Sequence, residues 1–153
     1  MTDRDAPPAG EIPEWPAYLA LLPLGAGLAG IALGGDAGTR ELAQRLAIAW
    51  GAVLLASGGA VHWGLALAAR LPWSTRLLCG ALLPAAAAAA ALLIGGQRAL
   101  ALLVVGSGTL WLYEHRVLGA QLPGAYLGLR RAQAVGACAL LTLSMFASER
   151  VGL

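Results

Sequence analysis

The chain contains 153 residues, of which 59% are hydrophobic and 12% are charged, whereas about a quarter of the residues in a soluble domain carry a charge. This composition excludes an ordinary soluble domain and predicts a membrane protein. All ten basic residues are arginines and the net charge is only +2. A nucleic-acid partner is therefore not expected, and no lysine is present to form a Schiff base.

Residues 1–14 are acidic and rich in proline, which predicts a mobile tail. The acidic charge does not suit a signal peptide, so the apolar block that follows should be retained. Residues 15–150 are expected to form one domain, an all-α integral membrane bundle of five transmembrane helices. The expected spans are about 17–35, 46–69, 77–94, 99–115 and 129–148. Pro23 should kink the first span, because proline removes a helix hydrogen bond.

The last two spans are short between their charged ends. Only 15 uncharged residues (99–113) separate Arg98 from Glu114, and only 17 (132–148) separate Arg131 from Glu149. A helix needs about 20 residues to cross the hydrocarbon core, so both helices should continue into their charged flanks. With five spans, six arginines lie on the side of the N-terminus and four on the other side. This excess favours a bacterial inner-membrane protein with a cytoplasmic N-terminus and a periplasmic C-terminus.

His62 lies in an apolar span, within the stretch "GGAVHWGLAL". Gly51, Leu55, Gly58 and His62 are separated by four, three and four residues, so they share one helix face. Two glycines on that face favour close contact with a neighbouring helix, and the imidazole should therefore point into the bundle, where it can find a polar partner. The alternative is a histidine with a purely structural role. Gly30 and Gly34, spaced by four in the first span, predict a second packing face.

The expected topology gathers polar side chains at one end of the bundle. The candidates for binding a ligand or partner there are His62, Trp63, Glu114, His115, Tyr126 and Arg130. Tyr126 and Arg130 are four residues apart and so share a helix face. The opposite end is expected to hold little beyond loop charges.

Other kinds of site have little support in the sequence. Cys79 and Cys138 lie in apolar blocks without the spacing of a zinc site, so we interpret them as packing residues and expect no metal. Ligation of haem b by His62 and His115 is disfavoured, because the two histidines should differ in depth by about 8 to 10 Å. The segment "GAGLAG" (25–30) fits a dinucleotide-binding pattern but lies inside a span without the required strand. A catalytic triad has no candidate aspartate within any span.

The stretch "WGAVLLASGGAVHWGLAL" (50–67) resembles an uncharacterised family of small membrane proteins, the domain of unknown function 3429 or transmembrane protein 69-like family. The order of features is similar along most of the chain, including "LLCGALLPAAA" in the third span and "AYLGLRRAQA" at the start of the last. The residues that carry the resemblance are His62, Trp63, Gly64, Tyr126, Leu129 and Arg130. The resemblance implies a membrane location and no known activity.

We therefore expect a multi-pass membrane protein that acts as a binding or assembly module, with its polar site at one end of the bundle. The expected partners are membrane lipid, another membrane subunit or a lipophilic small molecule. Arginine offers a planar fork for an anionic group, and histidine adds a donor that can change its charge. The alternative is a transporter or channel subunit. A membrane enzyme or haem protein is a third possibility, which the scarcity of titratable groups disfavours.

Overall fold

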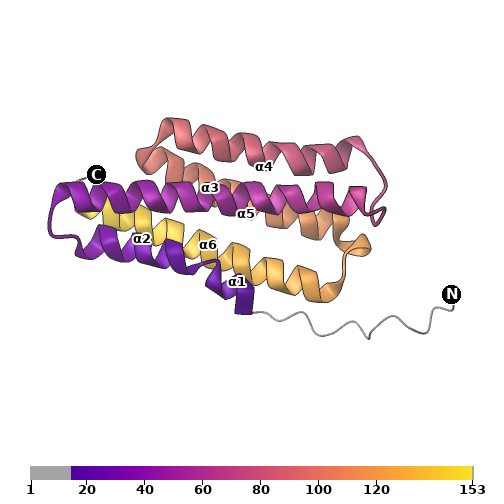
Figure 1. Ribbon diagram of the computed structural model, residues 1–153, viewed down its shortest axis with the longest axis horizontal. Coiled ribbons are helices and arrows are strands. Elements are labelled where there is room, and N and C mark those ends of the chain that lie inside the picture. The colour runs from indigo at the N-terminus through magenta and orange to yellow at the C-terminus, as the bar shows by residue number, and fades with distance from the viewer. Residues whose placement is uncertain (1–14, 153) are drawn as a thin grey trace.

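The computed structural model describes residues 15–152, which form helices and connecting turns without a strand. The expected tail, 1–14, lies outside the described residues. Five long helices run side by side (Figure 1). The helices in chain order are α1 (Trp15–Leu19), α2 (Leu22–Leu33), α3 (Ala37–Leu67), α4 (Thr75–Ile94), α5 (Gly96–Tyr113), η1 (Glu114–Leu118), η2 (Gly119–Gln121) and α6 (Gly124–Arg150). The all-α fold expected from the sequence is confirmed.

The first apolar block is broken near the expected position. Helix α1 ends at Leu19, and α2 begins three residues later. Pro23 is the second residue of α2 and lies four residues after Leu19. A proline has no N–H to donate to the carbonyl four residues back, and its ring crowds that carbonyl. The break therefore occurs where Pro23 forces it.

Helix α3 is longer than the expected span 46–69, because it begins at Ala37. The carboxylate of Asp36 caps its first turn by accepting from the backbone N–H of Thr39 at 2.9 Å and from the Thr39 hydroxyl at 2.6 Å. The hydroxyl, followed by the N–H, lowers the pKa of Asp36. A helix of 31 residues is about 46 Å long, which exceeds the hydrocarbon thickness of about 30 Å. Helix α3 is therefore longer than a single crossing requires.

A short turn connects α4 to α5. Gly95 and Gly96 both have positive φ angles, +67° and +57°. Side chains with a Cβ rarely adopt this conformation, so the glycine pair allows the chain to reverse with only Gly95 between the two helices. Pro84 lies inside α4 without ending it.

Helix α3 packs against all the other long helices, and its contacts with α4 and α2 are the most extensive. In Figure 1 it runs across the front, with α4 on one side and α2 on the other. Gly27 and Gly30 of α2 lie against Ala47 and Ala43 of α3, where added Cβ atoms would come within 2.9 and 2.6 Å of the alanine methyl groups. Gly34, the other expected packing glycine, caps α2 through Gly30 and also lies against α3, where an added Cβ would come within 2.9 Å of the Arg40 side chain.

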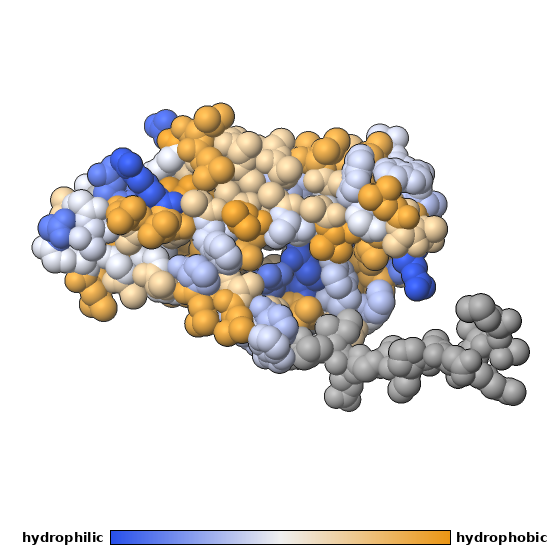
Figure 2. Space-filling view, viewed as in Figure 1, coloured by the Kyte–Doolittle hydropathy of each residue, from blue (hydrophilic) through white to orange (hydrophobic). Residues whose placement is uncertain are grey.

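Four segments are long and apolar enough to cross a membrane: 15–33, α3, α4 and α6. Helix α5 does not belong to this set, so the expected number of five transmembrane helices is not confirmed. Figure 2 shows apolar side chains over much of the face viewed, with hydrophilic residues concentrated toward the ends and in one hollow between them. The fold is thus that of a membrane protein by length and composition of its helices.

Candidate functional site

Four of the expected candidates meet at one end of the bundle: His62 of α3, Glu114 of η1, and Tyr126 and Arg130 of α6. The side chains of His62 and Glu114 are completely buried. Glu114 accepts hydrogen bonds from Arg130 Nε at 3.1 and 3.3 Å and from the Tyr126 hydroxyl at 3.1 Å. His62 Nε2 lies 3.3 Å from Glu114 Oε1. We refer to these four residues as the polar cluster.

Glu114 continues the buried face of α5, because it lies four residues after Leu110 and eleven after Leu103, which are both buried. Residues Glu114–Leu118 form a π-helical turn directly after α5. Such turns widen the helix and are frequent at functional sites. Glu114 points inward and is fully buried, whereas the next residue, His115, is exposed and stacks on Trp111 with a ring distance of 5.9 Å. The expected helical continuation beyond residue 113 is therefore present, in π-helical form.

Pro84 explains why an apolar helix carries His62. In a regular helix the N–H of residue 84 would donate to the carbonyl of Gly80, but proline has no N–H. His62 Nδ1 lies 3.2 Å from that carbonyl oxygen. Because a carbonyl can only accept, Nδ1 carries a proton and replaces the missing donor. This contact joins α3 to α4 and fixes the orientation of the ring.

The orientation of the His62 ring directs its other nitrogen, Nε2, toward Glu114. With Nδ1 protonated, a neutral imidazole would present the lone pair of Nε2 to the Glu114 carboxylate. Within residues 15–152, Nε2 has no hydrogen bond of good geometry, although it lies at ion-pair distance from Glu114. The two side chains attract each other only when one further proton lies on Nε2 or on the carboxyl group.

Arg130 is the member of the cluster that reaches the surface, with 13% of its side chain exposed. Its Nη1 donates to Gln133 Oε1 at 2.6 Å. A Cβ on Gly58 would overlap Nη2, so the absence of a side chain there makes room for the guanidinium. Arg130 and Gln133 also line a pocket of about 20 Å³ between α3, α5 and α6. That volume is enough for one water-sized group, and we call this hollow the arginine pocket.

Two of the expected candidates do not belong to the cluster. Trp63 is 42% exposed and packs edge-on against Trp73, with a ring distance of 5.4 Å. His115 is exposed on the outside of the π-helical turn.

Both nitrogens of His62 face protein oxygens, so the geometry does not favour haem ligation by His62 and His115. Within the described part of the chain, no three His, Cys, Asp or Glu side chains could hold a metal ion.

The opposite end contains a buried polar contact that the sequence analysis did not find. Gln44 of α3 donates to the Ser148 hydroxyl of α6 at 2.9 Å, and both side chains are buried. Leucines fill the bundle between this pair and the polar cluster, among them Leu55, Leu103 and Leu141. The two polar regions are therefore separated by an apolar core.

Three further residues around the polar cluster were not predicted from the sequence: Gly80, Tyr113 and Gln133. The Tyr113 ring packs edge-on against His62 at 5.9 Å, and a Cβ on Gly80 would lie 2.5 Å from that ring. The position of Pro84 four residues after Gly80 was the available signal for the free carbonyl. Gln133 could have been found because it lies one helical turn after Arg130.

Comparison with known proteins places the chain in a family. No curated protein matches the chain, and no solved structure matches it. The profile of the family described as "Protein of unknown function (DUF3429)" matches residues 9–146, which include the whole polar cluster and all but the end of α6. The chain belongs to this family of unknown function.

Proposed function

We propose that the protein crosses the bacterial inner membrane five times and serves as a binding or assembly module for another membrane subunit. Helix α5 supplies the fifth crossing in this proposal. It contacts α3, α4 and α6, and its Leu100 and Leu103 are fully buried. Its 18 residues span about 27 Å, close to the thickness of the hydrocarbon core. The excess of arginines on the side of the N-terminus supports a cytoplasmic N-terminus.

One observation carries the binding role: Arg130 is held rigidly by Glu114 and Gln133 but is still reachable from the surface. Ionisable groups inside a membrane are costly and usually functional. The arginine pocket admits a single small group, which suits a carbonyl or carboxylate oxygen from a partner helix. A quinone-like ring or a haem would need a much larger cavity at this point, and we propose that neither is bound here. The apolar core between the two polar regions disfavours a transport path.

Replacement of Arg130 by alanine is expected to abolish recovery of the partner in mild detergent. Replacement of the adjacent, exposed Arg131 should leave recovery unchanged. A hydrogen bond to a charged group contributes about 1.5–3 kcal/mol, which corresponds to at least a tenfold loss of affinity. Mass spectrometry of co-purified proteins and lipids measures the effect. Equal recovery with both variants would contradict the proposal.

A second variant separates binding from folding. Ala134 lines the arginine pocket, and leucine at this position should fill the pocket without touching the bond between Glu114 and Arg130. The matched control is Ala139→Leu, on an exposed face of the same helix. We expect Ala134→Leu to lose the partner and to keep the melting temperature of the control. If the partner remains bound to Ala134→Leu, the cluster has only a structural role. If a lipophilic molecule is lost instead of a protein, the binding site remains but the proposed partner is wrong.

A further inference from the structure

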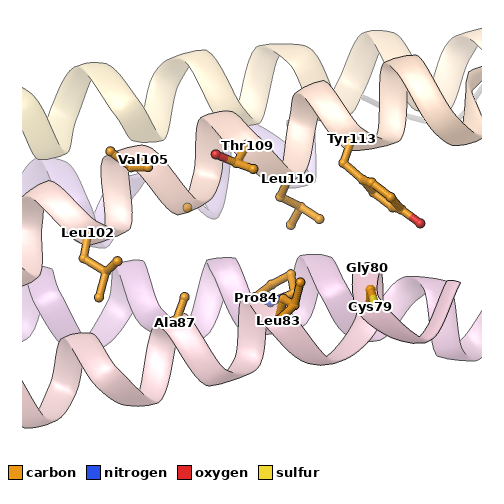
Figure 3. Close-up of a pocket in the computed structure, with 11 residues that line it drawn as sticks. Cys79, Gly80, Leu83, Pro84, Ala87, Leu102, Val105, Thr109, Leu110 and Tyr113 are labelled. Atoms are coloured by element: carbon orange, nitrogen blue, oxygen red, sulfur yellow. The ribbon is translucent and has the colours of Figure 1, made fainter. Parts of the chain in front are cut away.

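A second hollow runs along the bundle between α4 and α5, outside the polar cluster (Figure 3). Its volume is about 300 Å³, and its lining is almost entirely apolar. Leu102 and Ala87 lie at one end, and Tyr113 and Gly80 lie at the other. Val105 and Leu83, both exposed, also line it. We call it the α4–α5 groove, and its apolar walls suit hydrocarbon better than water.

The length of the groove matches one leaflet of a membrane. From Leu102 to Tyr113, α5 rises by eleven residues, or about 17 Å. Half of a hydrocarbon core is about 15 Å. Tyr113 is the last residue of α5 and marks the end of the groove nearer the membrane surface, where tyrosine rings are favoured. A chain that entered beside Tyr113 would thus reach the middle of the membrane.

The walls of the groove indicate what can occupy it. Leu83 and Val105 are exposed and line the groove, so it is open to the surroundings of the bundle. In a membrane those surroundings are acyl chains at every depth of the hydrocarbon core. A single acyl chain is therefore the occupant of the groove in this proposal.

Another hollow lies near the groove at the end marked by Tyr113. It has a volume of about 480 Å³, and most of its lining is apolar, but Ser74, Thr75, Arg76 and Gln121 also line it. The Tyr113 hydroxyl donates to the backbone carbonyl of Arg76 at 2.6 Å, so this bond lies between the two hollows. Arg76 is exposed, and its guanidinium makes no ion pair within residues 15–152. We call this hollow the head pocket.

We propose that the groove and the head pocket together bind one anionic phospholipid from the leaflet at this end of the bundle. One acyl chain occupies the α4–α5 groove, and the phosphate accepts hydrogen bonds from Arg76. The arginine fork matches the geometry of a phosphate. An anionic lipid is preferred over a zwitterionic one because no cation in its headgroup offsets the charge of that phosphate. This site uses neither Arg130 nor the arginine pocket, so it goes beyond the proposed binding of a partner subunit.

Filling the groove tests the acyl-chain part of the proposal. Ala87 lines the groove, whereas its neighbour Ala86 is exposed and does not. Purified full-length protein is titrated with phosphatidylglycerol, and bound lipid is counted by native mass spectrometry. We expect Ala87→Phe to bind at least about tenfold more weakly than Ala86→Phe. Equal binding by the two variants would overturn the proposal. So would a dimer that only Ala87→Phe dissociates, because a second copy would then cover the groove.

Replacement of the arginine tests the head pocket. Arg76→Gln should lose about tenfold in affinity for phosphatidylglycerol, because a charge-assisted hydrogen bond is removed. Binding of phosphatidylcholine should change much less, so the preference for the anionic lipid disappears. Arg98→Gln, at an exposed site on the opposite end of the bundle, should bind both lipids like the unchanged protein. An unchanged lipid preference in Arg76→Gln would overturn the assignment. None of these variants touches the polar cluster, so recovery of a partner subunit is a separate readout.

Discussion

Replacement of Glu114 by alanine is expected to lower the free energy of unfolding by about 3–5 kcal/mol, because it removes a buried carboxylate that Arg130 Nε and the Tyr126 hydroxyl, both part-buried, use as their acceptor. Glu114 is the only group of the polar cluster that accepts from Arg130 Nε and Tyr126 together, and its side chain is fully buried. Without it, the guanidinium retains Gln133 as an acceptor, and His62 faces a cavity. Unfolding in a detergent–dodecyl sulfate titration, followed by circular dichroism, measures the difference.

The matched control for this prediction is Glu41→Ala. Glu41 also pairs with an arginine, Arg45, but their side chains are 52% and 72% exposed. Exposed ion pairs contribute at most about 1 kcal/mol, so this variant should be nearly neutral. A double variant, Glu114→Leu with Arg130→Leu, should be less destabilised than the sum of its single changes, since it removes both charges. If Glu114→Ala costs no more than Glu41→Ala, the cluster does not contain a buried ion pair.

Much of the cluster's placement followed from spacing. The steps of four, three and four between Gly51, Leu55, Gly58 and His62 predicted an inward imidazole, and His62 is fully buried. The glycines of this stripe face the side chains of α5 and α6: a Cβ on Gly51 would lie 3.0 Å from Leu103 and 3.3 Å from Leu141. Helix periodicity and the small size of glycine were sufficient to predict that His62 points into the bundle.

Trp63 and His115 were included because the expected topology places them at the same end of the bundle as His62 and Glu114, but a shared end does not determine which way a side chain faces. Successive residues on a helix point about 100° apart, so the neighbour of an inward residue generally faces outward. Trp63 and His115 do so. The inward direction of Glu114 agrees with helix periodicity, because it lies four residues after the buried Leu110. The π-helical turn that begins at Glu114 has no such signal in the sequence.

The link between Pro84 and His62 shows what a single sequence leaves undetermined. The proline identified a carbonyl without its helical donor, and the histidine needed an acceptor, but these facts concern different helices. The residues become partners only because α3 and α4 pack with a particular axial offset. That offset depends on the close approach of α3 to α4 at Gly59. Gly59 was not among the packing glycines predicted from the sequence.

Replacement of Gly59 by alanine is expected to destabilise the protein by about 1–3 kcal/mol through overpacking between α3 and α4. A Cβ at this position would lie 2.7 Å from the backbone oxygen of Ala81 and 3.1 Å from the ring of Pro84. Neither neighbour is the end of a flexible side chain, so the helices must separate. Separation moves His62 away from Gly80, and the change should therefore also weaken the polar cluster.

Gly64→Ala is the control, because Gly64 lies in the same helix with nothing within 4 Å of an added Cβ. Alanine favours a helix over glycine by about 1 kcal/mol, so this variant should be as stable as the unchanged protein or more stable. A double variant, Gly59→Ala with His62→Ala, distinguishes local crowding from loss of the histidine contact. If the separation of α3 and α4 disables the contact with Gly80, the two changes should cost less together than the sum of their separate effects. Strict additivity would mean that the histidine contact does not depend on the spacing that Gly59 permits.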